Sequence, residues 1–486
     1  MEKWCYNMKK PELLAPAGDF EKLKFAILYG ADAVYLSGTS FGLRAKAKNF
    51  DNAELATAIS YAHSHNVRVY ITANIFAHNA NITDMQNYFA TLAEMGTDAF
   101  IISDPGVFQL AKTEAPNTEI HISTQANTTN YASVNFWHNL GASRVILARE
   151  LSLQEIAETR KKSPETVQLE GFVHGAMCMA YSGRCMLSRY MTNNENNNVR
   201  DANLGECTHP CRYGYKLYAE EISRPGKFMP IEEHANGTDI FAAEDLCLVA
   251  HIPELLAAGL TSFKIEGRMK TIFYTGLTTK VYRMAIDDFF KDEKIYTENI
   301  PKYIQMLQMA SHRPFTTGFY FGKPKNEFLD MSYSRSHDFV GIVLDSETAE
   351  NTENSEPNEN GETTKITIEQ RNLFELGETL QFIEPTSTTP EVFSIQATTL
   401  TDENNANITK ANHARQKIIL KTATSRKIAP FTLICKPVKP ENTENSTAPI
   451  NPIEQNKNSG VKGTRSLAGC GAAPHGFNVL KLSNDG

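Results

Sequence analysis

The sequence predicts a (β/α)8 barrel followed by a small all-β domain. Apolar runs alternate with helix-like segments from residue 11 to about residue 290. Several of the helix-like segments end at a glycine that leads directly into the next apolar run. After about Ser334 the pattern changes to short β-like runs. Eight alternating units are typical of a parallel barrel, although a doubly wound open sheet has the same alternation.

Glycines and capping residues mark the expected helix boundaries. Glycine favours the left-handed conformation that follows a helix, and the branched and aromatic residues after it are typical of a buried parallel strand. The stretches SLQE and DNAE match a capping box and a looser version of it. The glycines that end the helix-like segments are Gly30, which begins GADAVYLS, and Gly96, Gly141 and Gly259 in similar stretches. The capping stretches begin at Asp51 and Ser152.

Eight strands are therefore expected in the barrel, which we place at residues 11–333. One gap between strands is abnormally long, at about 90 residues, and the insertion within it is placed at residues 174–247. Helices fill most of the other gaps. The expected strands begin near Glu12, Ala33, Val67, Asp98, Glu119, Arg144, Gln168 and Ser262.

The rest of the chain is predicted to form a small β-barrel-like domain and a tail. Residues 334–437 contain short β-like runs such as FVGIVLD, TKITIEQ and FTLIC, separated by turns. Residues 438–486 are rich in Asn, Ser, Pro and Gly, which predicts a low-complexity tail.

Composition is typical of a globular protein, and the lack of a membrane span and of a signal peptide predicts a cytoplasmic one. The chain has 486 residues, of which 41% are hydrophobic and 21% charged, and its net charge is -8. Its apolar runs fall short of the roughly 20 residues that cross a bilayer, and its start lacks the apolar core of a signal peptide. We expect no membrane partner. Thiols stay reduced in the cytoplasm, so clustered cysteines there favour metal binding or catalysis over disulfides.

Four cysteines are clustered in the insertion. Cys178 and Cys185 lie in VHGAMCMAYSGRCML, and Cys207 and Cys211 lie in GECTHPCRYGY. Four thiolates match the ligand set of a 4Fe–4S cluster, and also that of a structural zinc. The wide spacing of the first pair favours the cluster. A fifth cysteine, Cys247, lies in an apparently helical stretch and is either a core residue or a replacement for one ligand.

Polar side chains are expected at the carboxyl ends of the strands, where barrel enzymes carry their chemistry. Alternation places His121 and Gln125 on a similar side if the fifth strand extends that far. Arginine suits an anionic ligand because its guanidinium pairs with carboxylate or phosphate at two points. Alternatively, these charged groups pair among themselves. The candidate catalytic residues are His121, Gln125, Arg149, Glu150, Glu266 and Arg268.

Long stretches of the chain resemble the collagenase-like peptidase family, family U32. They are EGFVHGAMCMAYSGRCMLSRY with CTHPCRYGY, PELLAPAGDFEKLKFAILYGADAVYLSG, and FKIEGRMK. The chain is most similar to the branch of tRNA hydroxylation proteins. That resemblance implies 5-hydroxyuridine formation at the wobble position of tRNA, with prephenate, a small anionic metabolite, as co-substrate. It also implies a 4Fe–4S cluster held by Cys178, Cys185, Cys207 and Cys211.

Two other functions compete with RNA hydroxylation. The family name suggests a peptidase, but the sequence contains no HExxH zinc motif, and the motif cysteines are expected to be occupied as ligands. The other alternative is a non-catalytic adaptor that carries a cluster and assists hydroxylation of another substrate. The sequence carries no indication of an oligomeric state.

Overall fold

The structure is a computed structural model of the chain. It describes residues 9–42, 49–177, 207, 218–220, 228–230, 244–322, 333–350, 362–424 and 426–438. Three of the predicted features, the cysteines Cys178, Cys185 and Cys211, lie outside these residues, as does all but the first residue of the predicted tail.

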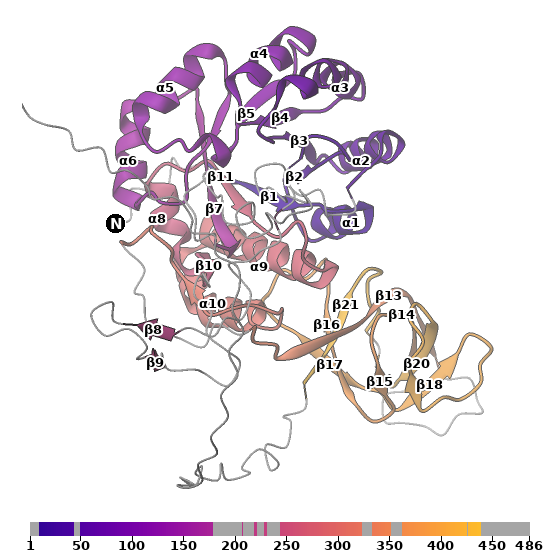
Figure 1. Ribbon diagram of the computed structural model, residues 1–486. Helices are drawn as coiled ribbons and strands as arrows, with labels where there is room; N and C mark the ends of the chain where they lie inside the picture. Colours follow the sequence, from indigo (N-terminus) through magenta and orange to yellow (C-terminus); the bar gives the residue numbers. More distant parts are fainter. Residues whose placement is uncertain are drawn as a thin grey trace, which may run out of the picture. The chain divides into compact units, whose positions relative to one another are not determined.

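Eight parallel strands close into a barrel (Figure 1). Each strand pairs with the next, and the last, β11, pairs with both β7 and β1. This closure confirms the barrel over the open sheet, and every strand starts within one residue of its predicted position. The strands are β1 Glu12–Pro16, β2 Ala33–Leu36, β3 Arg68–Ala73, β4 Ala99–Ile102, β5 Glu119–Ile122, β6 Arg144–Ile146, β7 Gln168–Ala176 and β11 Ser262–Ile265.

Helices surround the strands on the outside of the barrel (Figure 1). They are α1 Phe20–Leu28, α2 Asn52–Ser64, α3 Ile82–Glu94, α4 Pro105–Glu114, α5 Tyr131–Leu140, α6 Leu153–Lys162, α8 Ile252–Ala257, α9 Ile272–Lys291 and α10 Glu293–Leu307. Short 3-10 helices span η2 Asn79–Asn81, η3 Thr124–Ala126 and η6 Val249–His251. None of the helices in the described ranges is long and apolar enough to cross a membrane.

The predicted helix boundaries are confirmed. Asp51 and Ser152 each form a complete capping box, so the DNAE stretch is a stronger cap than its sequence indicated. The four helix-terminating glycines all adopt positive φ, from 86° at Gly96 to 106° at Gly141. A side chain at these positions would be strained, which explains why glycine occupies them.

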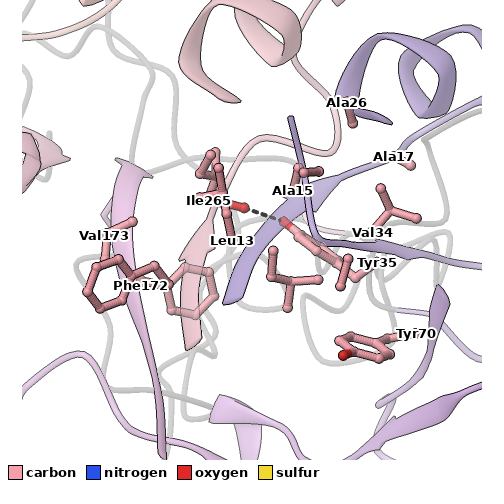
Figure 2. Packing of buried hydrophobic residues seen from close by; sticks show 14 of the residues in the cluster. Leu13, Ala15, Ala17, Ala26, Val34, Tyr35, Tyr70, Phe172, Val173 and Ile265 are labelled. Atoms are coloured by element: carbon pink, nitrogen blue, oxygen red, sulfur yellow. Dashed lines mark hydrogen bonds between the residues drawn. The ribbon is translucent and has the colours of Figure 1, made fainter. Parts of the chain in front are cut away.

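Apolar side chains fill the space between the strands and the helices. Figure 2 shows Leu13 and Ala15 of β1 among other buried residues of this core. Removal of such apolar surface from water is the main contribution to stability. The Tyr35 hydroxyl donates a hydrogen bond of 3.0 Å to the Ile265 carbonyl, drawn as a dashed line in Figure 2. This bond links β2 to β11, the two neighbours of β1.

The end of the insertion adds strands to the barrel. β10, Asp245–Cys247, runs antiparallel to the extended end of β7, and β12, Phe315–Thr316, runs parallel to β10. β8 Tyr218–Glu220 and β9 Phe228–Pro230 form a separate antiparallel pair. The helical interpretation of the Cys247 stretch is wrong. β7 is nine residues long and offers a free edge beyond the barrel, so residues 245–247 pair with it.

The second domain is an antiparallel β structure with its own apolar core, as the sequence predicted. Seven of its strands form one sheet in the order β17-β16-β21-β13-β14-β20-β18, and β15 pairs with β19. The strands are β13 His337–Glu350, β14 Glu362–Gln370, β15 Phe374–Glu375, β16 Thr379–Ile383, β17 Phe393–Gln396, β18 Thr399–Asp402, β19 Lys410–Ala411, β20 Lys417–Thr422 and β21 Leu433–Pro437.

Tyr29, the residue that ends α1, connects the barrel to the β domain. Its buried hydroxyl lies 2.8 Å from the Ile383 carbonyl and 2.9 Å from the Phe431 carbonyl, and it accepts a bond of 3.0 Å from the Leu433 N–H. A single side chain thus satisfies backbone groups of two segments of the second domain. Such groups cost free energy when they are buried without a partner.

We expect Tyr29→Phe to lower the free energy of unfolding by about 1–3 kcal/mol, because it leaves the Leu433 N–H buried and unpaired. Urea unfolding followed by circular dichroism measures this loss. Tyr131→Phe is the matched control, because Tyr131 is exposed on α5 and the ring that contacts Lys162 is retained. Equal stability of both variants would contradict the role of Tyr29.

Candidate functional site

The interior of the barrel contains a buried ionic network centred on Arg144. Arg144 is the first residue of β6, and its guanidinium forms ion pairs with Glu12 of β1 and Glu170 of β7. It also donates a hydrogen bond of 2.8 Å to the side-chain oxygen of Gln168. A buried guanidinium requires such partners, since an unpaired charge in the interior is costly.

Glu170 extends this network towards the carboxyl ends of the strands. One of its oxygens accepts from Arg144 at 3.0 Å, and the other lies 3.1 Å from Nζ of Lys264 on β11. Burial raises the pKa of Glu170, but Lys264 and Arg144 together bring it below its ordinary value. The carboxylate is therefore ionised and bridges two cations from neighbouring strands.

His121 belongs to the network and not to the barrel mouth. Its Nε2 lies 3.2 Å from a carboxylate oxygen of Glu119, the first residue of β5, and its ring packs edge-on against Tyr70. Burial lowers the pKa of His121 to about 4, so the ring is neutral and Nε2–H donates to Glu119. This hydrogen bond from His121 lowers the pKa of Glu119 to about 2.

Gln125 is separated from His121 by the end of the strand. The expected alternation fails because β5 ends at Ile122, and Ser123 then caps a 3-10 helix, accepting from the Gln125 N–H at 3.3 Å. Ser123 itself accepts a bond of 3.1 Å from the Asn74 amide beyond β3. His121 and Gln125 therefore lie on different parts of the barrel.

Cations and aromatic rings gather at the carboxyl ends of β2, β6, β7 and β11. The Arg149 guanidinium lies 4.0 Å from the centroid of the Phe172 ring. Nζ of Lys264 lies 4.5 Å from the Tyr35 centroid and 5.6 Å from the Phe172 centroid. Burial lowers the pKa of Lys264, Glu170 opposes that shift, and Arg144 and Arg149 add to it. We call Tyr35, Arg149, Phe172 and Lys264 the mouth cluster.

Arg268 lies beyond β11, over the interior of the barrel. It is buried, and its Nη1 donates a bond of 3.0 Å to the Thr72 hydroxyl on β3. Its backbone carbonyl packs directly on Gly18, where a Cβ would lie 2.1 Å from that oxygen. Gly18 therefore lets the loop after β1 approach the loop after β11, and this contact fixes the position of Arg268.

The two predicted acids occupy loops next to the mouth cluster. Glu150 follows Arg149 and is half-buried. The N–H of Glu266 donates a bond of 2.8 Å to the His174 carbonyl, and its own carbonyl accepts one of 3.0 Å from the Tyr274 hydroxyl. The backbone of Glu266 therefore links β7 and α9.

The cysteine site is described only in part. Cys207 is partly exposed, and Cys247 is a free thiol on β10. In the antiparallel pairing of β10 with β7, Cys247 lies opposite His174. His174 is four residues before Cys178 in the chain. Burial raises the pKa of Cys247 to about 11. Within the described ranges, no group of His, Cys, Asp or Glu residues could hold a metal ion.

His174 is a buried residue of β7, not a loop histidine. Its ring is surrounded by the rings of Tyr274, Tyr282 and Phe315, with centroids 5.5 to 5.9 Å away. Burial lowers its pKa to about 3, so the ring is neutral. This cluster of rings packs between β7 and the end of the insertion.

The network residues Glu12 and Arg144 and the mouth residue Lys264 were not among the predicted site residues. A pattern in the sequence identifies Lys264. In SFKI, Lys264 stands between Phe263 and Ile265, so its side chain points to the opposite face from two apolar neighbours. A charge at an inward position of a buried strand indicates an internal ion pair.

The neutral His121 makes stability depend on pH. The unfolded state takes up a proton near pH 6.5 and the folded state only near pH 4, so stability falls as pH falls through this window. We expect His121 to contribute a loss on the order of 3 kcal/mol from pH 7 to pH 4, so the total loss should be smaller in His121→Gln. Urea midpoints measured across this range check the slope. His413→Gln, at an exposed position, is the control, and an unchanged slope in His121→Gln contradicts the assignment.

Comparisons with known proteins agree with this architecture. A family model described as peptidase family U32 matches residues 18–330, and a model of its C-terminal domain matches residues 335–434. The chain is 36% identical over 431 residues to tRNA hydroxylation protein P1 of Bacillus subtilis, covering 88% of this chain and 95% of that protein. It is 35% identical over 419 residues to tRNA hydroxylation protein P of Escherichia coli, covering 78% and 87%. It is 34% identical over 281 residues to the Escherichia coli 23S rRNA 5-hydroxycytidine C2501 synthase, covering 58% and 40%. The chain therefore belongs to peptidase family U32.

Proposed function

We propose that this protein is an RNA-modifying enzyme that hydroxylates tRNA. The observation that carries the proposal is the match to a protein named for tRNA hydroxylation, which covers 88% of this chain and 95% of that protein. A second relative is named for 5-hydroxycytidine synthesis in ribosomal RNA, so hydroxylation of RNA is common to both names. We further propose that the product is 5-hydroxyuridine at the wobble position, with prephenate as co-substrate.

The mouth cluster suits an anionic co-substrate. Arg149 and Lys264 place two cations at the carboxyl ends of β6 and β11, the two strands that flank β7, and Arg268 adds a third from beyond β11. Charge-assisted hydrogen bonds from such groups are strong where water is excluded. Prephenate is a dicarboxylate, so its two charges match this arrangement. The rings of Tyr35 and Phe172 offer an apolar surface for its carbon ring.

A 4Fe–4S cluster is proposed as the cofactor. Cys178, Cys185 and Cys207 would hold it, with either Cys211 or Cys247 as the fourth ligand. Cys247 fits as a free thiol, and β10 brings it next to the strand that leads into Cys178. When bound, a cluster of this kind supplies electron transfer. The chain itself contributes the anchoring strands β7 and β10 and the aromatic wall around His174.

Proteolysis is less well supported than RNA hydroxylation. A thiol protease requires an accessible, activated thiolate next to a base. Burial raises the pKa of Cys247 to about 11, and it raises the pKa of Cys435 further. These buried thiols are protonated at neutral pH. His174, the histidine next to Cys247, is neutral and surrounded by aromatic rings.

Nucleoside analysis tests the reaction. We expect tRNA from a strain lacking this gene to lose 5-hydroxyuridine, and expression of the wild-type chain to restore it. Arg149→Ala should restore at most about a tenth of the product, because one co-substrate carboxylate loses a charged partner. Lys161→Ala, at an exposed position on α6, is the control. Full restoration by Arg149→Ala places the anion site elsewhere. Unchanged 5-hydroxyuridine in the deletion strain overturns the proposed reaction.

Metal analysis tests the cofactor independently of activity. We expect anaerobically purified protein to contain about four irons and four sulfides per chain. Cys178→Ala should lose most of this iron, whereas Cys5→Ala, outside the predicted set, should retain it. Comparison of Cys211→Ala with Cys247→Ala then identifies the fourth ligand as the residue whose loss releases iron. One zinc per chain without iron would refute the cluster.

A further inference from the structure

An exposed aromatic residue and an ammonium group lie next to the barrel mouth. After β11 the chain turns back, with the Lys270 N–H donating 2.8 Å to the Gly267 carbonyl. This turn places Nζ of Lys270 5.3 Å from the ring centroid of Tyr274 and 4.7 Å from that of Tyr333. No carboxylate among the residues described here forms an ion pair with Lys270. Within the described residues, its ammonium group lies over the faces of these two rings.

Tyr333 is anchored at its base and open to solvent. The guanidinium of Arg313 lies 5.6 Å from the ring centroid, and Arg313 is itself buried and paired with Asp245, with Nη2 and Oδ1 3.2 Å apart. Tyr333 is nevertheless 46% exposed, and Met269, next to Lys270 in the chain, is 44% exposed. We call Met269, Lys270, Arg313 and Tyr333 the Tyr333 platform.

Single exposed aromatic residues are common on protein surfaces and by themselves indicate nothing. The Tyr333 platform differs because it combines an open ring, a methionine and a lysine, Lys270, that forms no ion pair with a carboxylate of the described ranges. Cation–π contacts at exposed sites are weak, so they do not account for keeping such a ring in water. The chain has a net charge of -8, so a local cationic site is a specific feature and not a property of the whole surface.

The position of the platform connects it with the mouth cluster. Met269 and Lys270 directly follow Arg268, which is bonded to Thr72 inside the barrel. Two residues of extended chain span only about 7 Å. A ligand on the platform therefore lies next to whatever occupies the mouth. Asp245, which holds Arg313, is also the first residue of β10, where the insertion returns to the barrel.

We propose that the Tyr333 platform binds an unpaired nucleotide of the RNA substrate, with the base stacked on Tyr333 and its phosphate next to Lys270. This inference rests on the proposed function, because it takes the ligand to be RNA. Proteins bind single strands through aromatic rings that stack on bases and cations that follow the backbone, and the platform combines both. Stacking accepts any base, so the platform holds a neighbour of the reacting nucleotide and does not select the base that reacts.

The test uses the full-length protein and two RNA probes. One probe is a hairpin with the anticodon loop sequence, and the other is a fully paired duplex of equal length. Dissociation constants come from fluorescence anisotropy at several salt concentrations. The variants are Tyr333→Ala, Tyr333→Phe and Lys270→Ala. Phe136→Ala is the matched control, because Phe136 is 55% exposed on α5, on the outside of the barrel. Circular dichroism and thermal melting verify that each variant is folded.

We expect Tyr333→Ala to bind the hairpin at least about fivefold more weakly, and Tyr333→Phe to stay within about twofold of wild type. Lys270→Ala should reduce the slope of affinity against salt by about 0.7, the contribution of one phosphate contact in a single strand. Phe136→Ala should match wild type, and binding to the duplex should be unchanged in every variant.

Two different failures are distinguishable. If wild type binds the hairpin and folded Tyr333→Ala binds it equally well, the platform inference is overturned and the proposed function stands. An equal loss in Phe136→Ala also overturns the platform, because the effect would then not be local. If wild type binds neither probe, RNA is not the substrate and the proposed function fails together with the inference.

Discussion

The buried carboxylate of Glu170 organises the barrel, because it joins two cations that approach it from different strands. Arg144 contacts it from β6 and Lys264 from β11, and Arg144 also reaches Glu12 on β1. Loss of this one carboxylate would leave two buried cations short of a partner, which costs much more than the pair contributes. The network therefore fixes the relative positions of the strands at the seam where the barrel closes.

The same network fixes the positions of the cations at the carboxyl ends of the strands. Lys264 is held by Glu170 on one side and lies over the rings of Tyr35 and Phe172 on the other. Arg149 lies on Phe172 and influences Lys264 through its charge. The cations of the mouth are thus held in place before a ligand arrives, and a preorganised site spends less free energy on ordering side chains.

The cysteine-bearing insertion is anchored at the same end of the barrel. β7 extends beyond the barrel, and β10 pairs with this extension, so the insertion leaves and returns at adjacent strands. Asp245 and Arg313 close the return with a buried ion pair, and Tyr333 covers that arginine. The proposed cofactor, co-substrate and RNA would therefore all lie at this one end of the barrel.

The sequence alone determined the elements of this protein. Glycines with positive φ, capping boxes and apolar runs act locally, so they predicted all eight barrel strands and the β-rich domain. The resemblance of the cysteine motifs to one family likewise required no structure. Local patterns could not decide how far each strand runs. They predicted His121 and Gln125 on one side of a longer strand. They also predicted a helix around Cys247, because apolar residues at positions 246, 248 and 249 are compatible with a helix or a strand.

Only the tertiary structure decided which charged groups meet. Glu12, Arg144, Glu170 and Lys264 come from strands up to about 250 residues apart in the chain, and their contact depends on the closure of the barrel. The same holds for Tyr333, which reaches Lys270 through packing between distant segments. The physical reason is that burial, and with it the pKa values and the strength of ion pairs, is a property of the assembled interior and not of any stretch of sequence.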